Sequence, residues 1–325
     1  MNILLFKLSK NNNFFLDFGN LVTEISSEHK KVKFDDQKPI HVWQSKPGES
    51  LFHSSKRFDI WFDGYINGIK NTSTTDFLKI MADRILQHGE VLLGEESGIF
   101  NIIVKDWLTK KIYLANDPGG LFPLCYSVKN NNFYASTHLY LMAKALNAKP
   151  DYVQVVSKEV FGYAIGPDTY FEGIKRLLPG EVIIFDPQTN SLESRYSEGY
   201  FQGYQEPTEG DLLEKVYWGL KTPIDRIVED HPKVGVMLSE GFDSRLIAAL
   251  FKQSGADVYS YTHGTAGTNG VRVVEKVAST LGLNHHFEEV AFPADQDQIQ
   301  RQLLLADNLH IPFWHRGSRY FRDLG

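Results

Sequence analysis

Short runs of aromatic and β-branched residues, separated by polar turn residues, dominate about the first 200 positions of the chain. Such runs, bounded by Gly, Asn and Asp, predict β-strands. The predicted strands cover residues 58–63, 98–105, 111–115, 132–136 and 181–185. Apolar residues three and four positions apart predict an amphipathic helix over 75–86, and 138–146 is a second helix candidate. Strands interleaved with helices predict a layered α+β domain.

The pattern changes near residue 210. Between Tyr196 and Gly210 the sequence is polar, Gly-rich and aromatic, which is typical of a linker. Beyond it, helices and strands alternate. Helices are predicted from Asp211 and at 244–253, 271–281 and 295–306, and strands at 234–238, 258–262 and 286–290. Repeated β-α-β units predict a parallel sheet that binds ligands at the carboxyl ends of its strands.

Composition narrows the class of protein. The 325 residues, 42% hydrophobic and 23% charged, are typical of a globular protein with room for about two domains. A formal net charge of −6 argues against a surface that binds nucleic acid through phosphate contacts. No run of roughly eighteen apolar residues and no signal-peptide pattern occur, so we expect no membrane partner. One cysteine, Cys125, excludes an intramolecular disulfide framework and favours a cytoplasmic location.

The most informative segment is Val234–Leu250. It predicts a buried strand, a loop of small residues over 239–243, and a helix that begins near Ser244. Such a loop presents backbone N–H groups and the positive end of the helix dipole to an anion, for example a pyrophosphate. The alternative interpretation is a strand-to-helix turn whose Ser and Asp side chains only cap the helix.

This loop resembles the Ser-Gly-Gly-x-Asp-Ser loop of the PP-loop ATP pyrophosphatases, in the form used by asparagine synthetases, except that Glu240 stands at the first glycine. Other stretches resemble the N-terminal glutaminase-type domain of class B asparagine synthetases, among them Asp63-Gly-Tyr-Ile-Asn-Gly68. The rest lie, in order, at 98–106, 114–126, 134–136 and 171–180, and 275–286 resembles a helix of the synthetase part. The resemblance spans roughly residues 60 to 290. It implies an Ntn-type layered α+β domain over 1–200 and an α/β PP-loop ATP-binding domain with a parallel sheet over 211–325.

Several positions depart from the glutaminase pattern. Active domains of this family use a cysteine directly after the initiator Met as nucleophile. This chain has Asn2 there, and Cys125 lies in an apolar, strand-like context typical of a core thiol. Among the residues that hold glutamine in the family, Asp63 and Tyr65 replace Asn and Glu, and Asn116 replaces an Arg that clamps a carboxylate. We therefore expect no glutamine hydrolysis.

The same loss occurs in two Cys-less branches of the superfamily, the β-lactam synthetases and the lasso-peptide cyclases. Resemblance to them implies that ATP adenylates a carboxylate and that an amine of the substrate then attacks it. The predicted function is an asparagine synthetase-like, ATP-dependent amide-forming ligase without glutaminase activity, acting on a small-molecule or peptide carboxylate. The alternative is a non-catalytic relative that acts as a binding or assembly partner. The catalytic residues, the carboxylate, the amine and the oligomeric state stay open.

The implied cofactors are ATP and Mg²⁺. The residues expected to bind them are Ser239, Gly241, Asp243, Ser244, Thr262 and His263. The first four would hold the β- and γ-phosphates, and Asp243 would also position the metal. Thr262 and His263 follow the second strand of the parallel sheet, where the family binds adenine. An ordinary strand-to-helix loop is the alternative at that place.

Glu240 leaves two possibilities for the loop. Its carboxylate either points to solvent or opposes phosphate binding, because a like charge within about 4–6 Å is unfavourable. A position with positive φ would also tolerate Glu poorly. Arg245 is a candidate to offset the charge.

Two further expectations concern the second half of the chain. Its histidines lack a convincing metal-ligand spacing and are expected to be structural or solvated, namely His263, His285, His286, His310 and His315. The sequence stops at Gly325 before the Gly-x-Gly-x-Asp-Glu motif of asparagine synthetase-like proteins. We therefore expect an incomplete C-terminal domain with an exposed apolar face.

Overall fold

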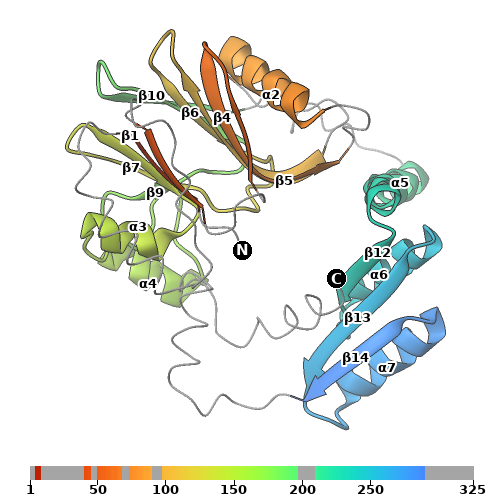
Figure 1. Cartoon of the computed structure of the whole chain (residues 1–325). Coiled ribbons are helices and arrows are strands. Elements are labelled where there is room, and N and C mark those ends of the chain that lie inside the picture. The colour runs from red at the N-terminus through yellow and green to blue at the C-terminus, as the bar shows by residue number, and fades with distance from the viewer. Residues whose placement is uncertain are drawn as a thin grey trace. The chain divides into compact units, whose positions relative to one another are not determined.

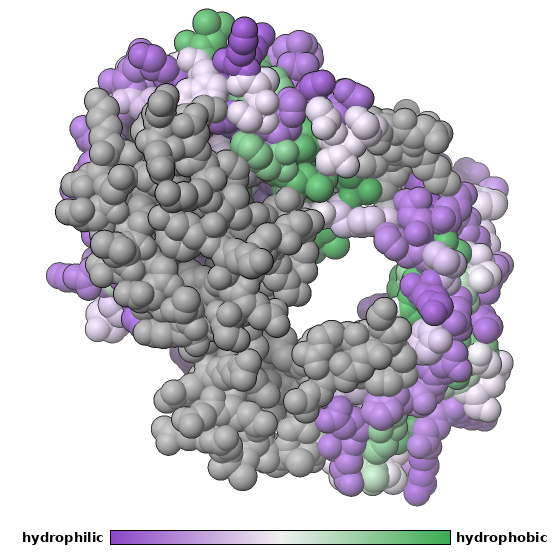
Figure 2. All heavy atoms as spheres, viewed as in Figure 1, coloured by the Kyte–Doolittle hydropathy of each residue, from purple (hydrophilic) through white to green (hydrophobic). Residues whose placement is uncertain are grey.

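The structure, a computed structural model, describes residues 4–8, 40–44, 50–67, 73–89, 97–196 and 209–289. The predicted helix at 295–306, together with Asn2, His310 and His315, lies outside these residues. The chain divides into two compact units, Met1–Gly203 (unit 1) and Tyr204–Gly325 (unit 2). Within the described part, no helix is long and apolar enough to cross a membrane. The face shown in Figure 2 is mostly polar over the described residues, with small separate apolar patches.

Unit 1 is built on two antiparallel sheets (Figure 1). The six-stranded sheet has the order β11-β10-β6-β5-β4-β3. Its strands are β3 (Ser50–Ser54), β4 (Phe58–Asn67), β5 (Ser97–Asp106), β6 (Ile112–Asn116), β10 (Glu181–Asp186) and β11 (Ser191–Tyr196). The five-stranded sheet has the order β2-β1-β8-β7-β9. It contains β1 (Leu4–Leu8), β2 (Ile40–Gln44), β7 (Cys125–Lys129), β8 (Asn132–Ser136) and β9 (Lys175–Arg176).

The central strands of the six-stranded sheet are buried on both faces. On β5, Ile102 and Val104 pack in the cluster formed with helix α2 (Thr74–His88), whereas Ile103 faces the other sheet. Phe133 of β8 and Phe185 of β10 join the two sheets, with ring centroids 4.9 Å apart. Helices α3 (Leu139–Leu146) and α4 (Tyr152–Phe161) cover the outer side of the five-stranded sheet (Figure 1). Unit 1 is therefore a four-layered α+β structure.

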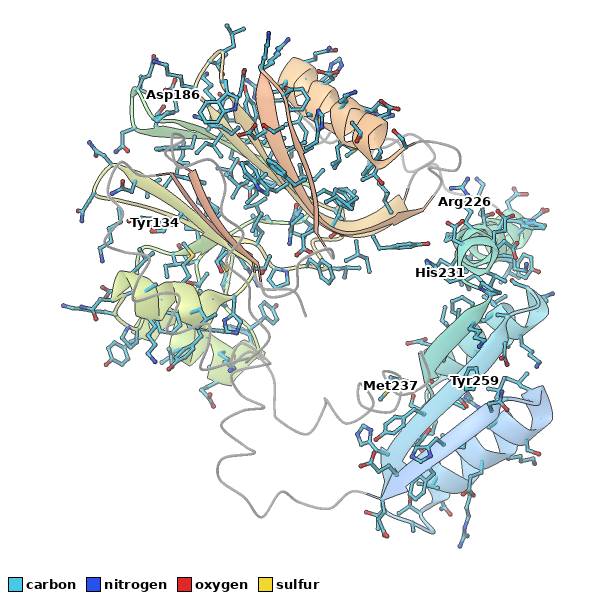
Figure 3. The ribbon with its side chains drawn as sticks, in the orientation of Figure 1. Tyr134, Asp186, Arg226, His231, Met237 and Tyr259 are labelled. Atoms are coloured by element: carbon cyan, nitrogen blue, oxygen red, sulfur yellow. The ribbon has the colours of Figure 1, made fainter. Side chains whose placement is uncertain are left out.

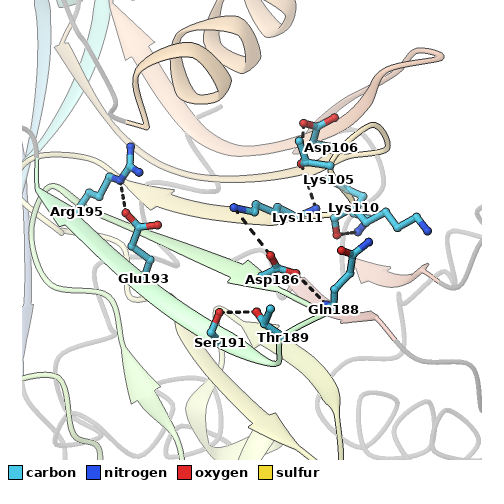
Figure 4. A network of polar contacts seen from close by, with 11 residues as sticks. Lys105, Asp106, Lys110, Lys111, Asp186, Gln188, Thr189, Ser191, Glu193 and Arg195 are labelled. Carbon is cyan, nitrogen blue, oxygen red and sulfur yellow. Dashed lines mark hydrogen bonds and ion pairs between the residues drawn. The ribbon is translucent and has the colours of Figure 1, made fainter.

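Polar side chains gather at one end of the six-stranded sheet (Figure 4). Lys105, which is 3% exposed, donates a hydrogen bond to the carbonyl oxygen of Lys110. Its ammonium nitrogen lies 5.6 Å from the centre of the Trp107 ring. Burial lowers the pKa of Lys105 to about 8. Nearby, the Nζ of Lys111 lies 3.9 Å from a carboxylate oxygen of Asp186.

Unit 2 is an α/β unit whose three strands form a parallel sheet in the order β12-β13-β14. Along the chain it contains α5 (Glu209–Asp230), β12 (Lys233–Met237), α6 (Phe242–Gln253), β13 (Asp257–Gly264), α7 (Asn269–Leu281) and β14 (Asn284–Glu289). Helices α6 and α7 lie on one face of the sheet (Figure 1). Its core joins Val236 and Val258 of the strands to Ala248 of α6 and Val274 of α7. This arrangement brings the carboxyl ends of β12 and β13 to the same edge of the sheet.

The expected fold class is confirmed for the described residues: a layered α+β unit precedes an α/β unit with a parallel sheet. Several boundaries were wrong. The predicted linker begins too early, because Tyr196 ends β11, and α5 begins at Glu209. Helices α6 and α7 each begin two residues before the predicted start. The added residues, Phe242 and Asp243 in α6 and Asn269 and Gly270 in α7, are polar, Gly or, for Phe242, 83% exposed, so they do not extend the buried apolar stripe.

Helix α4 was missed for a different reason. Its pattern is reversed, because Gln154 and Ser157 are buried while Tyr152, Val153 and Val160 are 67–75% exposed. The Gln154 side chain accepts a hydrogen bond from the backbone N–H of Ile165, which explains its burial. An inward-facing polar stripe does not give the signal by which a surface helix is recognised.

Candidate functional site

Three polar residues lie side by side on adjacent strands at one end of the unit 1 sandwich. Asp63 of β4 pairs with Asn101 of β5, which in turn pairs with Asn116 of β6. Each lies two positions from a residue of the core between the sheets, on the same strand, namely Trp61, Ile103 and Leu114. Because side chains two apart on a strand share a face, the row faces the space between the sheets. Two of the positions that hold glutamine in the resemblance, Asp63 and Asn116, therefore flank Asn101 in one row.

The row is closed off from solvent. Asp63 is 7% exposed, and Asn101 and Asn116 are each 1% exposed. Both amide atoms of Asn101 and the Oδ1 of Asn116 have no hydrogen-bond partner. Position 64, directly after Asp63, requires glycine. Its φ is +135°, and a Cβ there would lie 2.2 Å from the carbonyl oxygen of Ile99.

Asp117, directly after the row, has a structural role. Its buried carboxylate accepts hydrogen bonds from the backbone N–H groups of Phe100 at 3.3 Å and Gly119 at 2.9 Å, and it also bonds the N–H of Leu121 at 3.2 Å. These bonds join the start of β5 to the loop that follows β6. The carboxylate is thus already occupied by its own backbone. Cys125, on β7, is buried at 3% exposure, as expected for a core thiol.

In unit 2, the loop between β12 and α6 is organised by two serines. The hydroxyl oxygens of Ser239 and Ser244 lie 2.9 Å apart. The backbone N–H of Ser239 donates to the Ser244 hydroxyl at 3.0 Å, and the N–H of Gly241 donates to the Ser239 hydroxyl at 3.2 Å. Gly241 is the N-cap of α6 and no side chain caps this helix. The first-turn N–H groups of α6 therefore remain available to an anion.

Glu240 causes no backbone strain, because it is not among the described residues with positive φ. The strain considered from the sequence is therefore absent. Arg245 is engaged with the loop itself: its Nε donates to the Gly241 carbonyl at 3.1 Å, and its guanidinium lies 4.4 Å from the centre of the Phe242 ring. Arg245 therefore contacts the loop backbone and the Phe242 ring. Neither of these contacts involves Glu240.

A cavity of about 670 Å³ lies at the carboxyl ends of β12 and β13, which is the edge where a parallel sheet binds ligands. Its volume is within the range of about 300–1,000 Å³ that is common for small-molecule sites. Residues from three elements line it, among them Met237, Ser239, Glu240, His263, Thr268 and Gly270. Figure 3 shows Met237 at this end of β12, and Tyr259 further back along β13.

Only some of the residues expected from the sequence line this cavity. Ser239, Thr262 and His263 line it. The hydroxyl of Thr262 is already used, because it donates to the Leu238 carbonyl oxygen at 2.6 Å. Asp243 is exposed in the first turn of α6. No group of three or more His, Cys, Asp or Glu side chains able to hold a metal occurs among the described residues.

Sequence reasoning missed Thr268 and Tyr261 near this cavity. Thr268 and Gly270 line it from the start of α7, and Tyr261 lines it from β13. Tyr261 is fully buried, stacks on His286 with ring centroids 5.8 Å apart, and donates to the Glu288 carboxylate at 2.6 Å. Strand alternation alone could have placed Tyr261 on the face opposite Ser260, but not its partners.

His285 is held in place by a neighbouring side chain. His285 Nδ1 lies 2.9 Å from the Ser260 hydroxyl. Burial lowers the pKa of His285, and its Nε2 has no hydrogen-bond partner. These contacts are those of a structural histidine.

The fold defines a two-unit class of protein, in which a unit with two antiparallel sheets precedes an α/β unit with a parallel sheet. Two family models match the chain, a glutamine amidotransferase domain over residues 66–197 and an asparagine synthase domain over residues 220–320. Both domain matches and the curated relatives support an asparagine synthetase class B-like family.

Curated relatives agree with this assignment. The chain is 25% identical over 268 residues to asparagine synthetase [glutamine-hydrolyzing] 1 of Bacillus subtilis, covering 81% of this chain and 41% of that protein. It is 26% identical over 212 residues to a probable asparagine synthetase [glutamine-hydrolyzing] of Acanthamoeba polyphaga mimivirus, covering 63% of this chain and 37% of that one. The chain thus spans about two fifths of the length of these relatives. Glutamine phosphoribosylpyrophosphate amidotransferase from B. subtilis aligns over 94% of this chain and 92% of its own, at 10% identity and a TM-score of 0.37.

Proposed function

We propose that this chain belongs to an ATP-dependent amide-forming ligase that lacks glutaminase activity. The observation that carries the proposal is the loop between β12 and α6, which lies inside the asparagine synthase match. There, Ser239 lines a cavity of about 670 Å³, its hydroxyl lies 2.9 Å from that of Ser244, and no side chain caps the start of α6. Neutral donors at a helix N-terminus suit a phosphate group.

The residues present fit ATP better than they fit a preformed metal site. The α6 end offers hydroxyl and backbone donors, and the end of β13 offers His263 as a flat ring at the cavity wall. Asp243 is the carboxylate on α6 that could join a Mg²⁺ ion shared with phosphates, since this ion is usually held by one or two carboxylates plus substrate oxygens. When bound, ATP would turn one carboxylate oxygen of the substrate into a leaving group, so that an amine can displace it.

The missing glutaminase activity is supported by the buried end of unit 1. A glutamine α-carboxylate calls for a cationic fork, and Asn116 offers only a neutral amide. Asp117 is occupied by backbone N–H groups. The amine would therefore come from free ammonia or from the substrate. A small-molecule or peptide carboxylate and a cytoplasmic location complete the proposal.

One observation favours a second function, that of a non-catalytic relative that binds or assembles with a partner. Glu240 lines the same cavity, so a negative charge stands beside the place proposed for phosphates. If this charge prevents nucleotide binding, the fold remains while turnover is lost.

The test is calorimetric titration of the chain with Mg·ATP, followed by an assay of pyrophosphate release with aspartate and ammonia. Ser244→Ala removes the hydroxyl that joins both ends of the loop, and we expect it to weaken Mg·ATP binding by at least about tenfold. Ser254→Ala is the matched control, because Ser254 lies at the opposite end of α6 and its hydroxyl donates to the Leu250 carbonyl, away from the loop. Equal affinity in all three proteins would count against a phosphate role for the loop. Ammonia release from glutamine would overturn the statement about unit 1.

A further inference from the structure

The side chain of Glu240 reaches from the loop to the start of α7. A Cβ atom built on Gly270 would lie 2.7 Å from the Oε2 of Glu240 and 3.3 Å from its Cδ. Gly270 does not have a positive φ, so the backbone conformation does not demand glycine. Glycine inside a helix is unfavourable relative to alanine. A side chain at position 270 would force the Glu240 carboxylate to shift.

The start of α7 has no negative group of its own. Thr268, its N-cap, forms no side-chain capping bond, because its hydroxyl donates to the Thr265 carbonyl at 2.9 Å. The first turn of α7 contains no acidic residue. A carboxylate is stabilised near the positive end of a helix dipole. Glu240 therefore supplies, from the neighbouring loop, the negative charge that α7 lacks.

Ser239 and Glu240 line the cavity from the loop before α6, and Thr268 and Gly270 line it from the start of α7. The Glu240 carboxylate lies at the start of α7, where the positive end of the helix dipole favours a negative charge. An anionic group of a ligand that enters the cavity comes close to the Glu240 carboxylate and is repelled by it.

We propose that Glu240 is a specificity-determining residue of the nucleotide site, which rejects metal-free nucleotide and admits the nucleotide only with a divalent cation on its phosphates. This inference rests on the proposed function. A nucleotide without metal brings its full negative charge next to the carboxylate. A divalent cation between phosphate and carboxylate oxygens turns this repulsion into a shared contact, because Mg²⁺ prefers oxygen ligands of both kinds.

The experiment compares three ligands by calorimetry: ATP with excess chelator, Mg·ATP, and adenosine. The proteins are the original chain, Glu240→Gln, and Glu275→Gln as a matched control that changes the same charge on the exposed face of α7. We expect the original chain and Glu275→Gln to prefer Mg·ATP over metal-free ATP by at least about tenfold. In Glu240→Gln, metal-free ATP should bind at least about fivefold tighter, so that the preference shrinks. Adenosine, which is uncharged, should bind all three proteins within about twofold.

Each result decides between the two proposals. An unchanged preference for Mg·ATP in Glu240→Gln, or an equal change for adenosine, overturns the role of Glu240 and leaves the proposed function standing. Binding of no nucleotide form to any variant overturns both.

The contact itself is tested without nucleotide by a double-mutant cycle. Gly270→Ala should raise the melting temperature more in the Glu240→Ala background than in the original chain, because in the latter the new methyl group meets the carboxylate. Additive shifts would show that Glu240 and Gly270 are independent, and would overturn the proposal.

Discussion

Two polar regions of this protein come from family sites, and the structure treats them in opposite ways. At the end of β5 and β6 in unit 1, the polar side chains are 1–7% exposed and Asp117 is bound by backbone N–H groups. At the start of α6 in unit 2, the side chains of the loop from Ser239 to Asp243 are exposed and no side chain caps the helix. The first region satisfies part of its own backbone, and the second offers donors to something else.

The difference shows how a ligand site and a structural site can be told apart within one chain. A buried carboxylate whose oxygens already accept several N–H groups cannot exchange them for a ligand without leaving those donors unpaired. Exposed hydroxyls and uncapped N–H groups bond to water, and they can exchange this water for a ligand at little cost in free energy. The polar side chains of unit 1 are therefore closed off from solvent, whereas those of the unit 2 loop are open to it.

Replacing one aspartate in each region tests the difference between the two regions most directly. We expect Asp117→Ala to lower the free energy of unfolding of unit 1 by about 3 kcal/mol, because it leaves buried N–H groups of Phe100 and Gly119 unpaired. Asp243→Ala, the matched change at the exposed start of α6, should lower the stability of unit 2 by only about 0.5 kcal/mol. Urea unfolding monitored for each unit measures both values. Similar losses would mean that Asp243 is as structural as Asp117.

The second prediction concerns Lys105 and applies to unit 1 alone. Its pKa is lowered to about 8 in the folded state, against an ordinary value of 10.5. Between these values the unfolded chain binds more protons than the folded one, so the contribution of this group to stability increases as the pH rises from 8 to 10.5. We expect this increase to be about 2 kcal/mol, after allowance for partial solvation.

Lys105→Met should remove this dependence. Urea unfolding of unit 1 at pH 8 and at pH 10 would reveal it as a smaller gain in stability in the variant. Lys79→Met is the control, since Lys79 is exposed on α2 and pairs with Asp76 at the surface. If both variants keep the same pH dependence as the original chain, the ammonium of Lys105 is well solvated.

The smallest expected effect lies in unit 2, at His285. Burial holds its pKa below the ordinary value of 6.5, so the unfolded state takes up a proton first as the pH falls. The stabilising contribution of the neutral ring is therefore present above pH 6.5 and is lost as the pH falls below it. His285→Asn should flatten the acid side of the unit 2 stability profile, measured by thermal unfolding between pH 5 and pH 8. His263→Asn, at the cavity wall, serves as comparison. A steeper acid loss in His285→Asn would contradict the expected direction.

Much of the fold could be predicted from local patterns. Strands buried on both faces, such as β5 and β10, are continuous apolar runs, and α2 shows a regular helical period ended by Gly89 in the left-handed region. Short strands at the sheet edges lack such a signal. The six residues of β11 are all exposed, and hydrogen bonding to β10 alone defines them as a strand. Helix α4 escaped prediction because its apolar residues point outward.

The candidate site shows the same division. The residue types of the loop, and the departure at Glu240, are legible in the sequence because a strand, a small-residue loop and a helix follow one another within twenty positions. The approach of Glu240 to Gly270 cannot be read from the sequence, because thirty positions separate the two residues in the chain. The parallel pairing of β12 with β13 brings their carboxyl ends together, and the first turns of α6 and α7 with them.

The sequence by itself determined the order of the elements, the family, and which chemical groups the loop contains, because these depend on residue type and local spacing. Only the tertiary structure decided which groups are already used. It closed the polar row of unit 1 between two sheets, placed the hydroxyl of Thr262 on the carbonyl of Leu238, and set a carboxylate at the start of α7. Hydrogen-bond partners and local charge depend on distances between segments far apart in the chain, and packing alone fixes those distances.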